Sequence, residues 1–247
     1  MKSISLAVIL ICAAMAARAE TLMVAVAANM APAMEDIRKG FTAETGVALA
    51  LTPGASGKFA AQIANGAPFD LFVSADMDYP RKLSQDGLAA DKPVRYAVGT
   101  LILWTLKDVE LSRGLAALTG PEFKKIAVAD PQTAPYGRQA VAALKAAGIY
   151  EQVSSKLVYG ESLAQANQFV ASQAADAGLV ARSIVETAEW KGKGRWVAVD
   201  RKLYAPIDQA LVILKPGAGK KSARRLRDYI LGRKGRAILR RYGYGLP

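Results

Sequence analysis

Short apolar runs alternate with amphipathic stretches along the chain. Residues 22–27 and 47–52 are apolar without polar alternation, which is typical of strands buried on both faces of a sheet. Between them, apolar side chains recur at helical spacing from Ala33 to Phe41, and Gly46 then provides a left-handed cap. This strand–helix–strand order predicts parallel strands covered by helices on both faces.

The same alternation continues towards the C-terminus. Further strands are expected at residues 69–74, 96–105, 126–129, 157–159, 177–181, 195–199 and 209–214, and further helices at 59–64, 78–86, 111–118, 138–147, 163–172 and 220–241. The run at 96–105 is longer than the others, so we expect it to cross from one lobe to another. The pattern predicts an α/β chain of two lobes, each with a central, mostly parallel sheet flanked by helices. We place residues 20–98 and 205–247 in lobe I and residues 99–204 in lobe II, joined by two crossing segments.

The first residues have the pattern of a secretion signal. Lys2 supplies a positive charge, and residues 4–17 are apolar but too few for a stable membrane anchor. Ala17 and Ala19 offer small residues at the two positions that a signal peptidase reads. We therefore expect residues 1–19 to be removed as a signal peptide, and a retained N-terminal anchor is the alternative.

The composition of the mature chain excludes most catalytic mechanisms. The 247 residues include no His, and the single cysteine, Cys12, lies in the predicted signal segment. Disulfides, cysteine nucleophiles, histidine bases and the usual zinc ligands are therefore excluded. An enzyme would have to use Asp, Glu, Lys, Ser or Tyr alone, and the sequence offers no nucleophile–base pair. We expect a protein that is not an enzyme.

The formal net charge of +12 indicates an anionic partner, which is a nucleic acid, a membrane surface or a small anion. The basic residues cluster at 220–241, where Leu226, Ile230, Ala237 and Ile238 fall at roughly helical spacing. This spacing predicts a packed pair of helices with a solvated basic face. No nucleic-acid motif or aromatic platform accompanies the charge, so we expect no nucleic-acid partner. A basic adhesin or nucleic-acid binder is the alternative from another functional class.

Four turns between a strand and a helix are candidate anion sites. Two lie in the first half of the chain, at residues 28–32 and 54–58, and two in the second half, at 130–137 and 160–162. The first turn of a helix leaves N–H groups free and carries partial positive charge. Because the carboxyl ends of parallel strands share one edge of a sheet, Asn29 and Ser56 should converge there. For the 54–58 turn alone, the simpler interpretation is a helix that Ser56 caps.

Several motifs in these regions carry a family resemblance. They are Ala27-Ala28-Asn29, Ala33-Met34-Glu35-Asp36-Ile37, Gly54-Ala55-Ser56-Gly57-Lys58, Gly66-Ala67-Pro68-Phe69-Asp70-Leu71-Phe72-Val73-Ser74-Ala75-Asp76, Ala129-Asp130-Pro131, Pro135-Tyr136-Gly137 and Arg241-Tyr242-Gly243. With them, nearly the whole mature chain resembles the periplasmic molybdate-binding proteins of ABC importers. The resemblance implies a type II periplasmic binding-protein fold that closes on molybdate or tungstate, without a cofactor. It also implies a periplasmic location and a permease with its ATPase as partners, and we expect a monomer.

By position, the resemblance implies ligand contacts at Asn29, Ser56, Tyr136 and Leu163, with Ala28 and Gly57 as further candidates. Asn29 and Ser56 would offer side-chain and backbone donors, whereas Tyr136 and Leu163 would offer mainly backbone N–H groups. Many members have Ser in place of Asn29, and this chain resembles the subgroup that pairs Asn there with Tyr at the position of Tyr136. The enterobacterial type also uses a Tyr where this chain has Ala181, and Tyr136 is the candidate to fill that space.

The chemistry of the anion constrains the site. Molybdate and tungstate are fully ionised at neutral pH and offer only acceptors, so their site should contain donors and no carboxylate. Phosphate keeps a proton and gains from an Asp acceptor. Lys58 either pairs with the anion or points to solvent, and Asp130 either caps the turn at 131–136 or enters the site. The sequence does not rank molybdate against tungstate, and sulfate remains an alternative ligand.

Asp70, Asp76 and Asp78 together have the composition of a metal-binding cluster. No His accompanies them. We expect Asp76 and Asp78 to cap the following helix instead.

Overall fold

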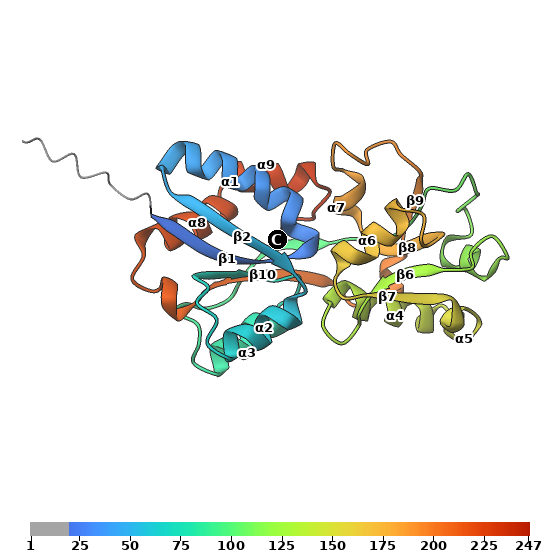
Figure 1. The fold of residues 1–247 in the computed structure, drawn as a ribbon, viewed down its shortest axis with the longest axis horizontal. Helices are drawn as coiled ribbons and strands as arrows, with labels where there is room; N and C mark the ends of the chain where they lie inside the picture. The colour runs from blue at the N-terminus through green and yellow to red at the C-terminus, as the bar shows by residue number, and fades with distance from the viewer. Residues whose placement is uncertain (1–19) are drawn as a thin grey trace, which may run out of the picture.

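The computed structural model describes residues 20–247, so the predicted signal segment 1–19 lies outside the described residues. Two five-stranded sheets, each flanked by helices, follow one another along the long axis of the molecule (Figure 1). We use lobe I for the sheet that contains the first strand, together with its helices, and lobe II for the other sheet with its helices. The two-lobed α/β architecture is confirmed.

Lobe I contains elements from both ends of the chain. Its strands are β1 (Thr21–Ala27), β2 (Ala48–Gly54), β3 (Leu71–Val73), β4 (Val94–Gly99) and β10 (Ile207–Ile213). Its helices are the 3₁₀ turns η1 (Ala28–Met30) and η5 (Lys215–Gly217) and the α-helices α1 (Ala31–Thr45), α2 (Ser56–Ala64), α3 (Asp78–Gln85), α8 (Lys221–Leu231) and α9 (Arg233–Arg241). The strand order is β2-β1-β3-β10-β4.

Lobe II is formed by the middle of the chain. Its strands are β5 (Leu101–Thr105), β6 (Ile126–Ala129), β7 (Leu157–Gly160), β8 (Ala177–Ala181) and β9 (Arg195–Ala198). Its helices are the 3₁₀ turns η2 (Gly114–Thr119), η3 (Ser154–Lys156) and η4 (Arg201–Leu203) and the α-helices α4 (Pro135–Ala146), α5 (Tyr150–Val153), α6 (Leu163–Ala171) and α7 (Arg182–Val185). The strand order is β7-β6-β8-β5-β9.

Each sheet contains four strands of one direction and one reversed strand. In lobe I, β10 is antiparallel to both β3 and β4. In lobe II, β5 is antiparallel to both β8 and β9. Each reversed strand comes directly after the chain has crossed between the lobes. The chain crosses to lobe II at Thr100, just before β5, and it returns to lobe I between β9 and β10. The mostly parallel sheets that the sequence predicts are therefore confirmed.

The parallel register aligns the strand ends that lead into helices. In lobe I, Ala27 at the end of β1 lies opposite Gly54 at the end of β2. In lobe II, Ala129 at the end of β6 lies opposite Gly160 at the end of β7. Both lobes thus present two neighbouring strand-to-helix turns at one sheet edge, as expected for parallel strands.

The lobe I sheet is covered on both faces. The predicted apolar side of α1 is buried against one face, together with residues of α8 and α9; from α1 these are Ala33, Met34, Ile37 and Phe41. Phe59 and Ile63 of α2 pack with Phe72 on the other face. Figure 1 shows α1, α8 and α9 on one side of the sheet and α2 and α3 on the other. Apolar burial on this scale is the main stabilising contribution.

The C-terminal basic segment forms the predicted pair of packed helices. Leu226 and Ile230 of α8 are fully buried, as expected. In α9, the deeply buried residue is Leu239, whereas Ala237 is exposed and Ile238 only partly buried. The break at Gly232 between the helices shifts the apolar side of α9 relative to a single continuous helix.

Two expected elements differ from the observed ones. The helix predicted at 111–118 is instead the short 3₁₀ turn η2, and Gly114 there has a φ of 57°, which a right-handed helix does not accommodate. Helix α4 begins at Pro135, before the predicted start, because proline fits the first helical position. The run at 96–105 crosses between the lobes as expected, because the chain passes at Thr100 from β4 of one sheet to β5 of the other.

No helix within residues 20–247 combines the length and apolar character needed to cross a bilayer.

Candidate functional site

A small cavity lies where strand-to-helix turns from the two lobes meet. Lobe I contributes the turns after β1, β2 and β3, and lobe II contributes the starts of α4 and α6. The lining residues are Ala27, Ala28, Asn29, Gly54, Ala55, Ser56, Ala75, Ala134, Pro135, Tyr136 and Leu163. Five of the six residues expected to contact a ligand are therefore brought together, and Gly57 is the exception.

The cavity offers hydrogen-bond donors and carries no charged side chain among its lining residues. Ser56, Tyr136 and Leu163 each lie in the first turn of a helix, where backbone N–H groups have no intrahelical acceptor. Asn29 lies in the 3₁₀ turn that begins α1. The helix dipoles add partial positive charge at the same points. An anion without a proton is the ligand that such a lining favours.

The size of the cavity restricts the ligand further. Its volume is about 10 Å³, compared with about 350 Å³ for the neighbouring open groove. A volume of this order holds about one water-sized group, so the chemistry of the lining and not the volume carries the choice among small anions. The closed cavity is too small for a sugar, an amino acid or a peptide.

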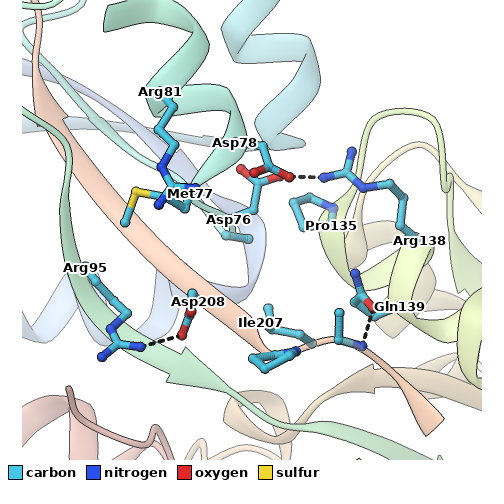
Figure 2. A pocket seen from close by; sticks show the side chains of 13 residues that line it. Asp76, Met77, Asp78, Arg81, Arg95, Pro135, Arg138, Gln139, Ile207 and Asp208 are labelled. Atoms are coloured by element: carbon cyan, nitrogen blue, oxygen red, sulfur yellow. Dashed lines mark hydrogen bonds and ion pairs between the residues drawn. The ribbon is translucent and has the colours of Figure 1, made fainter.

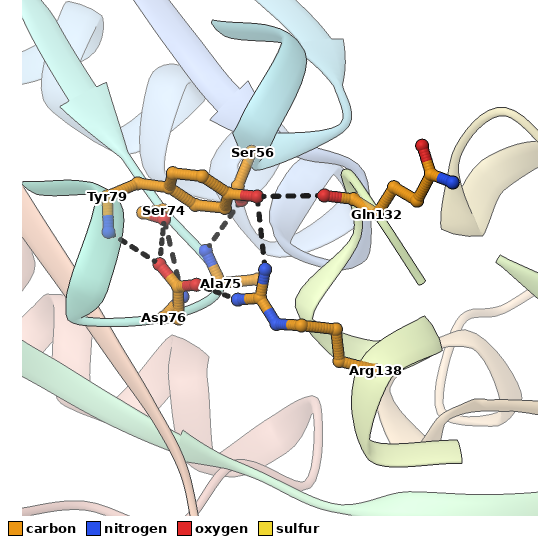
Figure 3. Close-up of polar contacts among 7 residues, drawn as sticks. All are labelled: Ser56, Ser74, Ala75, Asp76, Tyr79, Gln132 and Arg138. Carbon is orange, nitrogen blue, oxygen red and sulfur yellow. Dashed lines mark hydrogen bonds and ion pairs between the residues drawn. The ribbon is translucent and has the colours of Figure 1, made fainter. Parts of the chain in front are cut away.

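The Ser56 side chain faces a neighbouring turn and does not cap a helix. Its Oγ accepts a hydrogen bond of 3.0 Å from the N–H of Ala75, which leaves the hydroxyl hydrogen available for donation (Figure 3). The cap position of α2 is Ala55, which has no side chain to accept a bond. The simpler interpretation of Ser56 as a helix cap is therefore wrong.

The Asn29 side chain is held by the protein behind the cavity. Its Nδ2 donates to Gln209 Oε1 (2.9 Å) and to the hydroxyl of Tyr244 (3.0 Å). Its backbone carbonyl accepts from the hydroxyls of Tyr244 (2.7 Å) and Ser183 (2.9 Å). Both side-chain N–H groups are thus occupied, so the side chain cannot also donate to a ligand as expected. The backbone N–H remains as the candidate donor of Asn29. Local sequence gave no signal for Gln209, Tyr244 or Ser183.

The Tyr136 side chain points into the crossing between the lobes. Its hydroxyl accepts a hydrogen bond of 3.2 Å from Gln209 Nε2, and a Cβ on Gly99 would lie only 2.1 Å from it. Burial raises the pKa of the Tyr136 phenol well above its ordinary value. Tyr136 thus lines the cavity from the first turn of α4 while its phenol packs at the crossing. Ala181 is buried at the end of β8 and does not line the cavity.

Gly57 connects the lobes. Its N–H donates to the backbone carbonyl of Thr133 in lobe II at 2.8 Å, so this donor is already occupied. The adjacent Lys58 forms an ion pair of 3.0 Å with Glu161 of lobe II, and both side chains are largely exposed. Lys58 does not line the cavity. The solvent-facing interpretation of Lys58 fits this position.

The acidic residues near the site have other partners. Asp130 caps its own turn by accepting from the N–H of Gln132 (2.9 Å) and from the hydroxyl of Thr133 (3.3 Å), as expected. Asp70 is buried and pairs with Lys220 (2.8 Å). Within residues 20–247, no group of three or more His, Cys, Asp or Glu side chains is arranged to hold a metal ion.

Of the two residues expected to cap α3, Asp76 satisfies an N–H group of its first turn, whereas the prediction for Asp78 is wrong, because the cap position is Met77. Asp76 Oδ1 accepts from the N–H of Tyr79 in the first turn (3.2 Å), and Asp78 is the first residue of the helix. Asp76 also pairs with Arg138, which the sequence did not predict.

The neighbouring groove has a different character. Charged side chains of both signs line it (Figure 2), namely Asp76, Asp78, Arg81, Arg95, Arg138 and Asp208. Arg95 and Asp208 form an ion pair of 3.0 Å on its floor of neighbouring strands β4 and β10. The three arginines and three carboxylates of the lining balance in formal charge, and Arg95 and Arg138 already pair with carboxylates, so the groove offers an anion no net attraction despite its greater volume.

Comparison with known proteins agrees with the fold and identifies the family. The model of the bacterial extracellular solute-binding protein family matches residues 22–245. The molybdate-binding protein ModA of Azotobacter vinelandii is 42% identical over 94% of this chain and 93% of its own length. The ModA protein of Rhodobacter capsulatus is 38% identical over 94% and 90%, respectively. The solved structure of the Azotobacter vinelandii periplasmic molybdate-binding protein superimposes with a TM-score of 0.87 at 35% identity, covering 92% of this chain and 99% of that one. The chain therefore belongs to the bacterial extracellular solute-binding protein family, alongside the ModA proteins, and is a binding protein rather than an enzyme.

Proposed function

We propose that this protein captures molybdate or tungstate in the cavity between its lobes and delivers the anion to the permease of an ABC transporter. In this proposal the protein works in the periplasm as a monomer, after removal of a signal peptide, and needs no cofactor. Its relatives from Azotobacter vinelandii and Rhodobacter capsulatus are named as molybdate-binding proteins, which supports this choice of ligand.

The observation that carries the proposal is the lining of the cavity. Helix starts from both lobes meet at one small space, and the residues of 20–247 that line it include no carboxylate, lysine or arginine. A doubly charged anion without a proton has only acceptors to satisfy, and neutral donors with helix dipoles satisfy them. Phosphate retains a proton near neutral pH, and the lining offers it no carboxylate acceptor.

Each lobe would supply part of the anion's coordination. Asn29, with Ala28 beside it, and Ser56 belong to lobe I, whereas Tyr136 and Leu163 belong to lobe II. Neither lobe alone surrounds the anion, so binding would require the lobes to separate for entry and to close afterwards. Direct bonds between the lobes, such as the bond from Gly57 to Thr133, would re-form at each closure.

Sulfate is the second candidate ligand. It has the same charge and the same lack of a proton, so the neutral lining is also compatible with it. The names of the relatives favour molybdate. Basic residues of α8 and α9 support a surface-binding function less well, because Lys234 and Arg241 already pair with Glu44 and Asp36.

Calorimetric titration of the purified protein with molybdate, tungstate, sulfate and phosphate tests the proposal. We expect tight binding of the first two, weaker binding of sulfate and no binding of phosphate. Tight binding of sulfate alone would replace the proposed ligand, and binding of none of the four would refute an oxyanion function.

A further inference from the structure

Two kinds of polar contact join the lobes around the cavity. One kind is neutral and buried, and it includes the bonds from Ser183 to the Asn29 carbonyl and from Gln209 to Tyr136. The other kind includes the ion pair between Asp76 of lobe I and Arg138 of lobe II (Figure 3). This pair differs from the neutral contacts because it places opposite charges on the two lobes.

Asp76 lies next to the wall of the cavity. The preceding residue, Ala75, lines the cavity and donates its N–H to Ser56 Oγ. The Asp76 carboxylate accepts from the hydroxyl of Ser74 (3.1 Å) and from the N–H of Tyr79 (3.2 Å), and only 12% of its side chain is exposed. Burial raises the pKa of this carboxyl because water no longer solvates its charge. An ionised Asp76 therefore depends on a nearby cation.

Arg138 supplies that cation from the other lobe. It lies in α4, two residues after Tyr136, and its guanidinium bonds to Asp76 Oδ2. Its Nη1 also donates to the Tyr79 hydroxyl (3.0 Å), and the guanidinium carbon lies 5.2 Å from the centroid of the Tyr79 ring. The other charged residues lining the groove balance one another, being two cations and two carboxylates: Arg81, Arg95, Asp78 and Asp208.

We propose that Arg138 and Asp76 form a charge-compensating pair that couples lobe closure to anion retention. In the closed form, Arg138 cancels the carboxylate beside the cavity, so the anion experiences the helix dipoles without opposition. When the lobes open, α4 carries Arg138 away from α3, and the uncompensated Asp76 carboxylate repels the anion. The pair would thereby favour retention when closed and release when open. Neither residue lines the cavity, so both act on the anion from outside its contact shell. The inference rests on the proposed oxyanion-binding function.

The alternative role is a simple latch that only stabilises the closed form. A latch predicts that loss of either partner weakens binding equally, since either substitution breaks the same pair. Charge compensation predicts unequal effects. Arg138→Gln leaves an unpaired carboxylate beside the anion, whereas Asp76→Asn removes the carboxylate and leaves a cation nearby.

The test is a set of three variants titrated with molybdate in a calorimeter, with release rates from stopped-flow fluorescence. We expect Asp76→Asn to bind within a few-fold of the unaltered protein and Arg138→Gln to bind at least about tenfold more weakly, with faster release. The double variant should bind more tightly than Arg138→Gln alone, because the second substitution removes the repelling charge. If Arg138→Gln weakened binding only by disturbing the structure around it, the second substitution would not restore affinity.

Lys58→Gln provides the matched control. It breaks another ion pair between the lobes, with Glu161, but that pair is largely exposed and does not line the cavity. Its effect should be less than about threefold, as for most exposed pairs. If Arg138→Gln does not fold, Arg138→Lys takes its place and should retain most of the affinity.

The outcomes separate the inference from the function on which it rests. Equal losses in the two single variants, without rescue in the double variant, would overturn charge compensation while the unaltered protein still binds molybdate. Arg138→Lys keeps the positive charge. If this variant nevertheless loses affinity, charge compensation is also overturned. Failure of the unaltered protein to bind any of the four anions would refute the proposed function itself.

Discussion

Gln209 Nε2 donates a hydrogen bond of 3.2 Å to the hydroxyl of Tyr136, and this bond ties the return strand of lobe I to the helix start of lobe II. The same side chain accepts from Asn29 Nδ2 (2.9 Å) and from the Tyr96 hydroxyl (2.8 Å). Gln209 is fully buried. The Gln209 amide therefore bonds to Asn29 of lobe I and to Tyr136 of lobe II, where the chain crosses between the lobes.

Gln209→Leu should lower stability. The substitution removes the acceptor of one Asn29 Nδ2 hydrogen and the donor to the Tyr136 hydroxyl, whereas the Tyr96 hydroxyl can still donate to the Ser74 carbonyl (3.1 Å). A buried polar group left without a partner costs about 1–3 kcal/mol. We expect the free energy of unfolding, measured by urea denaturation, to fall by at least about 2 kcal/mol. Gln152→Leu, at an exposed position, is the control and should change stability little. A value for Gln209→Leu close to that of the control would contradict the role of this network.

Gly57→Ala should hinder lobe closure. A Cβ at this position would lie 2.9 Å from the Thr133 carbonyl oxygen and 2.5 Å from the Tyr79 hydroxyl. The Tyr79 hydroxyl belongs to lobe I and is the end of a flexible side chain that can move aside, whereas the Thr133 oxygen belongs to lobe II and meets the Cβ only in the closed form. Strain against Thr133, of about 1–3 kcal/mol, therefore weakens ligand affinity about 5- to 150-fold. Stability should not fall in parallel, because Ala is the better helix former. Calorimetric titration measures the ligand affinity, and small-angle scattering measures how far the ligand closes the lobes.

Gly219→Ala is the control for this prediction, since a Cβ at that position meets nothing within 4 Å. Unchanged affinity in Gly57→Ala would show that the contact with Thr133 does not form in the liganded protein.

Ser56→Ala should weaken anion binding without unfolding the protein. It removes a hydroxyl donor from the cavity, and a hydrogen bond to a charged group contributes about 1.5–3 kcal/mol. The expected loss of affinity is therefore about ten- to a hundredfold, measured by calorimetry. Ser155→Ala, an exposed serine of η3, should bind as the unaltered protein does. Equal affinities of these two variants would remove Ser56 from the ligand contacts.

The buried tyrosines predict a loss of stability in alkali. Burial raises the pKa of Tyr244 to about 12 and those of Tyr96 and Tyr136 well above the ordinary value. The unfolded chain loses these protons near pH 10, whereas the folded protein retains them. Their contribution to stability is thus fully present below about pH 10 and is lost as the pH rises towards about 12.

Denaturant unfolding across this pH range, together with phenolate absorbance of the folded protein, checks that prediction. Nine tyrosines are present, and the buried ones should ionise only with unfolding. Ionisation of all nine in the folded state near the ordinary pKa would contradict it.

The sequence predicted the elements and the helix starts because these depend on local features. Apolar runs define the strands and Gly46 defines a helix cap within a few residues, although the start of α4 at Pro135 was missed by three residues. The pairing of two turns within each lobe followed from parallel topology, since parallel strands end at one sheet edge. The resemblance added the facing of the two lobes and the identities of the candidate contact residues.

The buried network was not predictable from the same features. Asn29 and Gln209 are 180 positions apart, and nothing near either residue indicates the other. The pairing of Asp76 with Arg138 likewise depends on how the two lobes meet. For the same reason, the sequence suggested a side-chain donor at Asn29, whereas the structure uses that amide behind the cavity.

The most direct test of the site is a crystal structure of the protein with molybdate, with the anion located by the anomalous scattering of molybdenum. We expect one strong peak in the cavity bounded by Asn29, Ser56, Tyr136 and Leu163, with anion oxygens about 2.7–3.2 Å from backbone N–H groups of both lobes. A peak in the charged groove near Arg95, or on the basic faces of α8 and α9, would contradict it.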